Sequence, residues 1–315
     1  MSRRASRRAR GERPGPAGFL IVDKPRGWTS HDAVDAARRW LGTRRVGHLG
    51  TLDPLATGVL PLAVRDATKL VPFLEGGEKS YAGTIRLGEE TDTLDADGRT
   101  LRRHAGPLPS EAELVAALAR FRGEIEQIPP MYSAVKHQGV PLHRLARQGR
   151  TVERAAKRVR IDRVELQKYA PPDLDLEVDC SAGTYVRALA QDLGQALGCG
   201  AHLLGLRRTR SGPFTLEHAH SEARLAQAAE RGEIDALLVP PVNALGLAAL
   251  RLDEREIREV RHGAEIPAPD PPLVPGSRLA ALDATGELVA ILEVRPGRRL
   301  RPLRVLGARS GAHGE

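Results

Sequence analysis

Residues 47–61, GHLGTLDPLATGVLP, place a single carboxylate, Asp53, among glycines, leucines and other small or apolar residues. The glycines let the backbone adopt positive φ and approach a ligand closely, and Pro54 restricts the chain directly after the acid. Apolar surroundings raise the pKa of a carboxyl group unless a cation or hydrogen-bond donors favour its ionised form. The stretch is therefore typical either of a reactive carboxylate or of a Gly/Pro turn whose aspartate caps a backbone N–H.

The length and composition indicate a globular protein with room for more than one domain. The chain has 315 residues, of which 41% are hydrophobic, enough for one large domain and a smaller one. The longest weakly polar run, residues 237–250, contains two prolines and an asparagine and is too short to span a bilayer. We therefore expect no membrane segment.

Two further observations bear on the cellular compartment. The arginines near the N-terminus are followed by Pro14, Gly15 and Pro16 rather than by an apolar stretch, so they do not form a secretory signal. The two cysteines, Cys180 and Cys199, form no C-x-x-C pair, so the sequence indicates neither a disulfide framework nor a zinc site. We expect a cytoplasmic protein without a metal site.

The formal net charge of +8 is unevenly distributed along the chain. Residues 1–17 carry six arginines and one glutamate, hence +5, which leaves +3 for the rest of the chain. This first segment is rich in Arg, Ser, Gly and Pro and is predicted to be a disordered basic arm. Residues 136–168 hold ten Lys or Arg against three acids, a local +7. Such a cluster is typical either of a polyanion-binding surface or of an ordinary solvated face.

Hydrophobic periodicity predicts a mixture of strands and helices. Alternation of apolar and polar residues indicates half-buried strands, and apolar residues at helical spacing after Ser, or after a Ser-x-x-Glu capping box, indicate helices. Strands are predicted over residues 19–22, 80–87, 159–166 with a break near 162–163, 174–180, 202–210 and, in three short pieces, 278–306; helices are predicted after the caps Ser30 and Ser110, after Gly183-Thr184, and over 222–231, 233–238 and 253–263.

Two segments stand apart from this pattern. Residues 124–152 contain two adjacent prolines, few apolar repeats and several cations, which predicts a long excursion from the core. The acidic turn at 91–98, TDTLDADG, resembles a calcium loop, but the alignment that places Gly98 correctly leaves Thr93 and His104 where the loop needs acids. We therefore reject a calcium site in this turn.

Four segments, taken together, resemble one enzyme family. They are DKPRGWTS (23–30), GHLGTLDPLATGVLP (47–61), EKSYAGTIRLGEETDTLDADG (78–98) and SAGTYVRALAQDLG (181–194). Their order and spacing resemble the bacterial tRNA pseudouridine-55 synthases of the TruB family. IPPMYSAVKHQG (128–139) and LGCGAHLLGLRR (197–208) look like further motifs of that family. The resemblance runs from about residue 18 to about residue 215, is weaker over the tail, and does not include the arm.

The resemblance implies both a fold and a reaction. The fold is expected to be α+β, with a mixed, mostly antiparallel central sheet flanked by helices (the pseudouridine synthase fold) over residues 18–245. The tail, 246–315, resembles the small β-rich PUA-like RNA-binding domain that some members carry. The implied reaction isomerises uridine 55 in the T-loop of tRNA: the N-glycosidic bond breaks, the base turns, and it is rejoined through carbon. The family uses no metal and no organic cofactor.

Residue by residue, the resemblance assigns an active site. Asp53 matches the catalytic aspartate; whether it attacks C1′, adds to C6 or removes a ribose proton is left open. Arg187 matches the arginine that pairs with it, a role that suits a fixed cation beside a desolvated carboxylate. Tyr81 matches the tyrosine that stacks on the target base and offers an ionisable hydroxyl. Tyr185 and Leu206 match positions close to the site. Without the motifs, Arg187 reads as a surface residue and the others as core.

Further motif positions indicate RNA binding. His48 matches a histidine that occupies the space vacated by flipped nucleotides, while Lys24 and Pro25 match a motif that buttresses the active-site loop. The basic region coincides with the family insertion, near 124–152 here, that grips the T stem-loop. A folded stem-loop is read largely through its shape and its unstacked nucleotides. The side chains expected to contact phosphates are Lys136, Arg144, Arg147 and Arg150.

Two rival functions stay open at this point. A non-catalytic RNA chaperone would use the same surface without needing Asp53, Arg187 and Tyr81 together. A synthase acting on ribosomal or guide-dependent RNA would need all three, although the insertion favours tRNA. We expect a monomer whose partner is the T stem-loop of tRNA, with no membrane association and no small-molecule cofactor.

Overall fold

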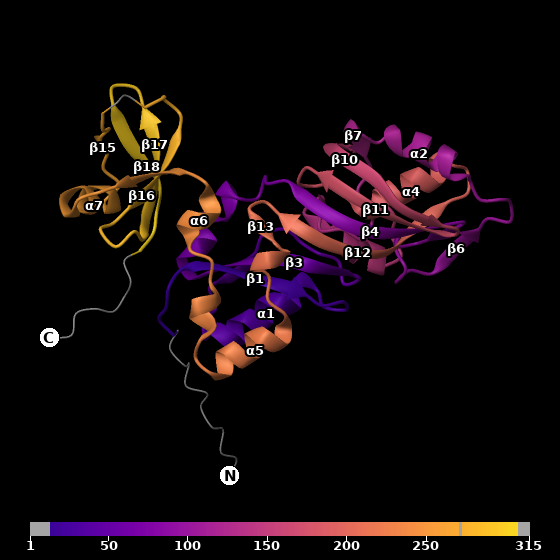
Figure 1. Cartoon of the computed structure of the whole chain (residues 1–315), viewed down its shortest axis with the longest axis horizontal. Helices are drawn as coiled ribbons and strands as arrows, with labels where there is room; N and C mark the ends of the chain where they lie inside the picture. Colours follow the sequence, from indigo (N-terminus) through magenta and orange to yellow (C-terminus); the bar gives the residue numbers. More distant parts are fainter. Residues whose placement is uncertain (1–12, 271–272, 308–315) are drawn as a thin grey trace, which may run out of the picture.

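A computed structural model describes residues 13–270 and 273–307. The larger sheet runs β1 (Gly18–Lys24), β3 (Ala56–Val64), β12 (Ala201–Ser211), β4 (Lys79–Leu87), β11 (Asp173–Cys180), β10 (Lys157–Ala170) and β7 (Gly123–Gln127), with β2 (Val46–His48) on β3 and β13 (Phe214–Thr215) on β12 (Figure 1). Its pairings are antiparallel except for that of β3 with β12. The predicted mixed, mostly antiparallel sheet is therefore confirmed.

Strands β4, β10 and β11 follow the predicted alternation because their part of the sheet has one packed face and one polar face. In β11 the apolar positions are buried, and the intervening acids lie on the other face. Two of these acids, Asp173 and Asp179, accept hydrogen bonds from Arg86 and Arg163. The predicted break in β10 is a register shift between Ile161 and Arg163.

β12 occupies the middle of the sheet, between β3 and β4, although it comes much later in the chain. It pairs with β3 in parallel over Leu206–Arg208 and Ala56–Gly58. Gly58 has a φ of +96°, and a Cβ at this position would lie 2.2 Å from the carbonyl oxygen of Arg208. Only glycine therefore allows β3, and the loop that precedes it, to approach β12 this closely.

The main helices cover the packed side of the sheet. Figure 1 shows α2 and α4 together on one side of β10, β11 and β4, and α1 and α5 together near β1. Leucines of α2 and α4 join the strands in one apolar core. In the described part of the chain, no helix is long and apolar enough to cross a membrane. The helices are α1 (Ser30–Leu41), α2 (Glu111–Ala119), α4 (Val186–Ala196) and α5 (Glu222–Glu230), with 3₁₀ turns η1 (Arg65–Phe73), η2 (Leu216–His218) and η3 (Ile234–Leu237).

Two local predictions are wrong. The cap of α1 is Thr29 rather than Ser30: the Thr29 side chain accepts from the Asp32 N–H, and the Asp32 carboxylate accepts from the Thr29 N–H. Ser30 is instead the first helical residue, and its hydroxyl bonds to a different loop. Residues 233–238 form only the 3₁₀ turn η3, because the backbone is already extended at Leu238. The capping box of Ser110 and Glu113 is confirmed.

The predicted excursion from the core begins later than expected. Residues 124–127 belong to β7, which pairs with β10 from Gly123 to Gln127. As an edge strand β7 is mostly exposed and lacks the apolar alternation that would have indicated a strand. The remaining part, residues 128–156, is called the insertion below. It contains β8 (Lys136–His137), β9 (Val140–Pro141) and α3 (Leu142–Arg147).

The tail forms a second, β-rich unit, as predicted. Its sheet runs β14-β16-β17-β18-β15, and Ile291 and Leu306 join Phe19 and Ile21 in one apolar cluster. The Asp66 carboxylate accepts from the Gly307 N–H at 2.7 Å. Domain limits of 18–245 and 246–315 stay a prediction. The elements are α6 (Pro241–Leu245), β14 (Ala248–Arg251), α7 (Glu254–Arg261), β15 (Ile266–Pro267), β16 (Arg278–Leu282), β17 (Leu288–Arg295) and β18 (Arg299–Val305).

Only the end of the predicted basic arm lies within the described residues. Residues 1–12 lie outside them, whereas 13–17 are described. The Arg13 N–H donates to the Gly42 carbonyl at 2.9 Å, and its guanidinium lies 3.4 Å from the Asp235 carboxylate. These five residues therefore differ from the disorder predicted for residues 1–17.

Candidate active site

The loop that carries Asp53 joins β2 to β3. Hydrogen bonds to its main chain hold it in place. The Ser30 hydroxyl accepts from the Leu52 N–H at 2.8 Å and donates to the Leu52 carbonyl at 3.0 Å. The Pro54 carbonyl accepts from the Gly27 N–H at 2.8 Å. The Asp53 side chain keeps 35% of its surface exposed. The carboxylate is thus open to a ligand while the backbone beneath it is fixed.

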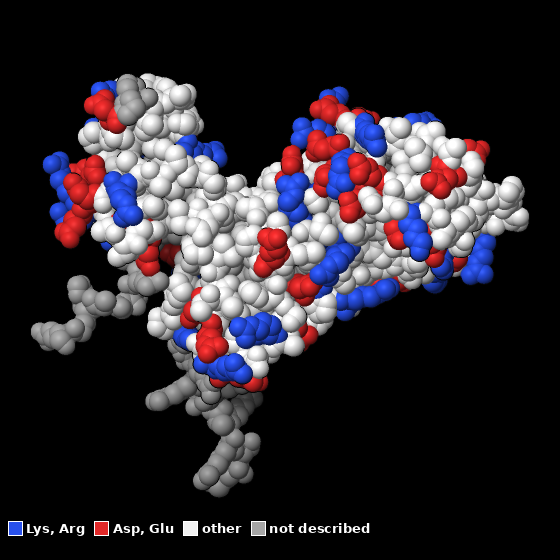
Figure 2. All heavy atoms as spheres, in the orientation of Figure 1, with Lys and Arg blue, Asp and Glu red and all other residues white. Residues whose placement is uncertain are grey.

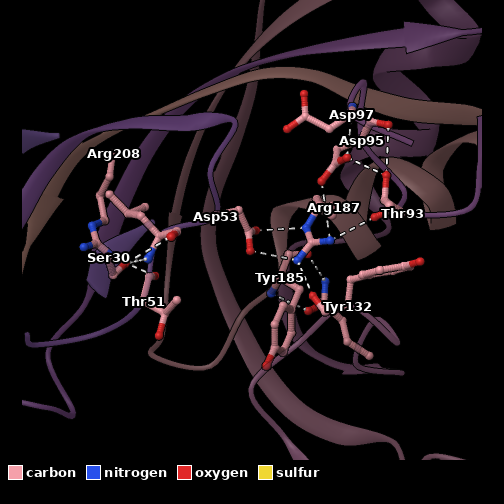
Figure 3. A network of polar contacts seen from close by, with 12 residues as sticks. Ser30, Thr51, Asp53, Thr93, Asp95, Asp97, Tyr132, Tyr185, Arg187 and Arg208 are labelled. Atoms are coloured by element: carbon pink, nitrogen blue, oxygen red, sulfur yellow. Dashed lines mark hydrogen bonds and ion pairs between the residues drawn. The ribbon is translucent and has the colours of Figure 1, made fainter. Parts of the chain in front are cut away.

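Arg187, in the first turn of α4, holds the Asp53 carboxylate with two nitrogens (Figure 3). Nη2 donates to Oδ1 at 2.9 Å, and Nε lies 2.9 Å from Oδ2. The same guanidinium donates to the carbonyls of Thr93 at 2.9 Å and Tyr132 at 2.7 Å. Its side chain is only 4% exposed, so this is a nearly buried, two-point ion pair.

Asp95 is a residue of this site that the sequence did not reveal. Its Oδ2 lies 3.4 Å from Nη1 of Arg187, so one guanidinium faces two carboxylates. Burial raises the pKa of Asp95, although the Thr93 hydroxyl and Arg187 oppose that effect. Leu94 adopts a φ of +65°, which lets the Thr93 carbonyl and the Asp95 carboxylate reach the same guanidinium. The acidic turn ends the motif over residues 78–98, but its spacing carries no sign of this partner.

The structure brings two of the predicted residues, Tyr81 and Leu206, to neighbouring strands. Tyr81 in β4 is 7% exposed, and burial raises the pKa of its phenol. Leu206 in β12 stands opposite Gly83 of β4 and opposite Ala56 of β3, three residues after Asp53. A cavity of about 480 Å³ is lined in part by Leu206, Gly83 and Leu55, beside the loop rather than at the carboxylate itself.

Tyr185 immediately precedes α4 and lies beside the Asp53–Arg187 pair in Figure 3. Its main chain is fixed by Gln127, whose side-chain amide accepts from the Tyr185 N–H at 3.0 Å and donates to the Tyr185 carbonyl at 3.3 Å. Burial raises the pKa of the Tyr185 phenol. Strand β7 therefore positions the start of the helix that carries Arg187.

Lys24 and His48 lie on the other side of the loop. The buried Lys24 ammonium donates to the carbonyls of Trp28 at 2.6 Å, Pro25 at 3.0 Å and Pro54 at 3.5 Å. Burial lowers the pKa of Lys24 to about 8, and the nearby Asp53 charge opposes this change. Burial also lowers the pKa of His48. The Lys24–Pro25 turn thus contacts the Asp53 loop directly, because the Lys24 ammonium donates to the Pro54 carbonyl.

The predicted phosphate-contacting residues lie away from Asp53, on the insertion. Lys136, Arg144, Arg147 and Arg150 are all exposed. Within residues 13–270 and 273–307, no carboxylate lies within ion-pair distance of these four side chains. The insertion still reaches the site, because the Tyr132 carbonyl accepts from Arg187.

Two cations of β10, Arg160 and Arg163, are by contrast paired with carboxylates of β10 itself and of other segments. Arg163 lies within 2.9 Å of carboxylates of Glu165 and Glu177 and 2.7 Å from Asp179, and Arg160 pairs with Asp162 at 3.0 Å. Figure 2 shows red and blue side chains interspersed over this part of the sheet rather than one continuous blue surface. Among the described residues, the unpaired positive charge of 136–168 therefore lies on the insertion and on Lys157, Arg158 and Lys168 of β10.

Comparison with known proteins agrees with this geometry. Residues 38–186 match the family described as TruB family pseudouridylate synthase (N terminal domain), and residues 187–245 match the tRNA pseudouridylate synthase B C-terminal domain. The chain is 43% identical over 294 residues to tRNA pseudouridine synthase B of Pseudomonas paraeruginosa, covering 92% of this chain and 96% of that protein. It is 45% identical over 293 residues to the protein of the same name from Mycobacterium bovis, covering 92% and 95%.

A solved structure supports the fold. An H/ACA ribonucleoprotein bound to a substrate RNA containing 2′-deoxyuridine includes a chain similar to this one, with a TM-score of 0.69 and 26% identity, covering 93% of this chain and 86% of that chain. The extent and identity of the sequence matches leave one assignment: this chain belongs to the TruB family of pseudouridylate synthases, which are isomerases.

Proposed function

We propose that this protein converts uridine 55 in the T-loop of tRNA to pseudouridine, with Asp53 as the catalytic residue. The observation that carries the proposal is the Asp53 carboxylate, 35% exposed yet held at two points by a nearly buried guanidinium. The relatives named tRNA pseudouridine synthase B support tRNA as the substrate.

The reaction is an isomerisation and needs no net donor or acceptor. The bond between N1 and C1′ breaks, the bond between C5 and C1′ forms, C5 loses a proton and N1 gains one. Attack of Asp53 on C1′, addition to C6 and removal of a ribose proton all require the carboxylate to be charged. The paired Arg187 guanidinium balances the charge of the Asp53 carboxylate and limits the directions in which its oxygens point.

Tyr81, Tyr185 and Leu206 would form the walls around the target base. The base must leave its stack before it can reach Asp53, at a cost of a few kcal/mol. A phenol ring gives a flat surface for stacking, and Tyr81 also offers a hydroxyl for proton transfer. The partly buried His48 would fill the space from which nucleotides are flipped.

The insertion would bind the T stem-loop. Its exposed cations have no carboxylate partner among the described residues and are therefore free to contact phosphates. Base identity would be read through the shape of the loop rather than by a linear code. We further propose that residues 246–315 act as a PUA-like RNA-binding domain, and that the protein works as a monomer in the cytoplasm.

The test is an assay with an unmodified T-arm hairpin whose uridines carry tritium at C5. Wild-type protein should release tritium, and Asp53→Asn should lower the single-turnover rate by about 10³-fold or more while changing affinity only a few-fold. Asp35→Asn, a surface change on α1, serves as the matched control and should keep the wild-type rate. Substantial turnover by Asp53→Asn would remove the catalytic assignment.

Two rivals predict different results. A non-catalytic RNA chaperone predicts binding and refolding of the hairpin by the wild-type protein without tritium release. A synthase for another RNA predicts that cells lacking this protein keep pseudouridine in the T-loop and lose it elsewhere. Mapping pseudouridine by mass in such cells distinguishes the second rival from the proposed function.

A further inference from the structure

A second buried arginine lies behind the Asp53 loop, on the side opposite Arg187 (Figure 3). Arg208, in β12, is fully buried. Its Nε donates to the Val59 carbonyl at 2.7 Å, Nη1 to the Thr51 carbonyl at 3.4 Å, and Nη2 to the Gly50 carbonyl at 3.3 Å. One guanidinium thus holds the loop before Asp53 and the strand after it.

Arg208 differs from the other buried arginines in its partners. Arg65 pairs with Asp235 at 3.0 Å, and Arg187 pairs with Asp53 at 2.9 Å. In the described part of the chain, no carboxylate lies within ion-pair distance of Arg208. Burying a charge without a counterion is costly, so a leucine or methionine would suit a purely structural role at this position better.

Arg208 also reaches Tyr81. The two residues are directly opposite each other in the antiparallel pairing of β12 with β4. The Arg208 charge lowers the pKa of the Tyr81 phenol, against the larger effect of burial, which raises it. The same residue therefore holds the loop that carries Asp53 and stands opposite Tyr81 in the neighbouring strand.

We propose that Arg208 is a positioning residue for the isomerisation, whose rigid guanidinium sets the place of the Asp53 loop relative to Tyr81 on the neighbouring strand. This inference deepens the proposed function and rests on it. A base stacked on Tyr81 meets the Asp53 carboxylate only if β4 and the loop keep their spacing, and a planar fork with donors in fixed directions holds that spacing better than a flexible ammonium. Because a displacement of about 1 Å at a reacting group can cost 100-fold in rate, the effect should be large.

The experiment compares Arg208→Lys and Arg208→Gln with Arg65→Lys. Arg65 is also buried but, unlike Arg208, has a carboxylate partner. Single-turnover rate, affinity for the T-arm hairpin and melting temperature are measured for each variant. Both Arg208 variants should lose about 100-fold in rate while affinity stays within about threefold. Arg65→Lys should lower the melting temperature and leave the rate unchanged below it.

Two further measurements separate positioning from stability. Guanidinium ion added at millimolar concentration should restore part of the rate of Arg208→Ala and should leave the rate of Arg65→Ala unchanged. In a Tyr81→Phe background, Arg208→Lys should lower the rate far less than in the wild type, because the hydroxyl that the Asp53 loop must face is then gone. If the Arg208 variants do not fold, the rescue is carried out by refolding Arg208→Ala in guanidinium ion and diluting it to the millimolar range.

Several outcomes would overturn the inference. They are a wild-type rate in Arg208→Lys, a loss that appears only in affinity, a loss that follows melting temperature as in Arg65→Lys, or the absence of rescue together with full additivity with Tyr81→Phe. Failure of the proposed function looks different: the wild-type protein itself would then release no tritium from the T-arm hairpin.

Discussion

The Asp53 loop and the insertion, residues 128–156, are built in opposite ways. The loop is joined to β1, α1, α4 and β12 by hydrogen bonds to Lys24, Ser30, Arg187 and Arg208. The insertion has two strands of two residues each, one short helix, and exposed cations without a carboxylate partner in the described chain. One region holds a single charge in a fixed place, whereas the other presents several charges that can move.

This difference indicates how the two proposed tasks, catalysis and RNA binding, are divided between the Asp53 loop and the insertion. A group that must meet developing charge works best when it is fixed in advance, because no reorganisation is then needed during the reaction. Phosphates of a folded RNA are contacted along a path, and long flexible cations can follow it. Substitutions in the loop should therefore change the rate, and substitutions in the insertion should change the affinity.

After Asp53→Asn, a large effect on the rate is expected at Arg187. Arg187→Lys keeps a positive charge but loses the two-point contact with Asp53 and the bonds to two carbonyls. The single-turnover rate should fall by about 100-fold, while hairpin affinity changes little. Arg38→Lys, which changes a half-exposed arginine on α1, is the control. A loss seen in affinity alone would break the comparison between the two regions.

A smaller, purely binding effect is expected for the insertion. Replacing Arg144, Arg147 and Arg150 with alanine should weaken hairpin binding by about tenfold and reduce the salt slope of log affinity by about one per arginine. The rate at saturating protein should stay unchanged. The control replaces three exposed arginines near α1 and α5, Arg39, Arg224 and Arg231. An unchanged salt slope would show that the RNA-contacting surface lies elsewhere.

The smallest effect is a pH dependence that comes from Lys24. Burial lowers the pKa of this ammonium to about 8, so the folded protein loses the positive charge near Asp53 as the pH rises through that value. The rate should then decline a few-fold above pH 8, and Lys24→Arg should remove the decline because arginine stays charged.

The free energy of unfolding changes with pH in the opposite direction to the rate. A loss of rate that comes from Lys24 can therefore be told apart from a loss of stability. Between pH 8 and 10.5 the unfolded chain holds more protons at Lys24 than the folded one, so this residue makes the fold more stable as the pH rises. A rate that falls between pH 8 and 10.5 is therefore not explained by a loss of stability that comes from Lys24. Lys69→Arg, at an exposed lysine paired with Asp66, should keep the wild-type pH profile. An identical profile for Lys24→Arg and wild type would contradict this account.

The sequence predicted most strands and helices because each has one packed face. The alternation in β11 and the stripe in α2 follow directly from that. It missed β3, which is buried on both faces, and β7, whose edge position needs no apolar alternation. It chose Ser30 over Thr29 as a cap, since either residue can accept the backbone bond. Such errors arise where local chemistry allows two answers and tertiary contacts select one.

The site was predicted in part. Asp53 and Arg187 came from motifs that are 134 residues apart, and only the fold could bring their atoms to 2.9 Å. Asp95 and Arg208 were not predicted as site residues, for a different reason. An acid in a polar turn and an arginine in a basic strand are ordinary in sequence, and what sets them apart is burial, which no local pattern records.

The central place of β12 has a consequence for how the protein is made. Until residue 211 has been synthesised, β3 and β4 lack the neighbour that lies between them, and β3 is almost wholly apolar. Open strand edges of this kind recruit other chains. A nascent chain that stalls before β12 emerges from the ribosome should therefore be captured by chaperones or aggregate, whereas one that stalls soon after it should already be protected.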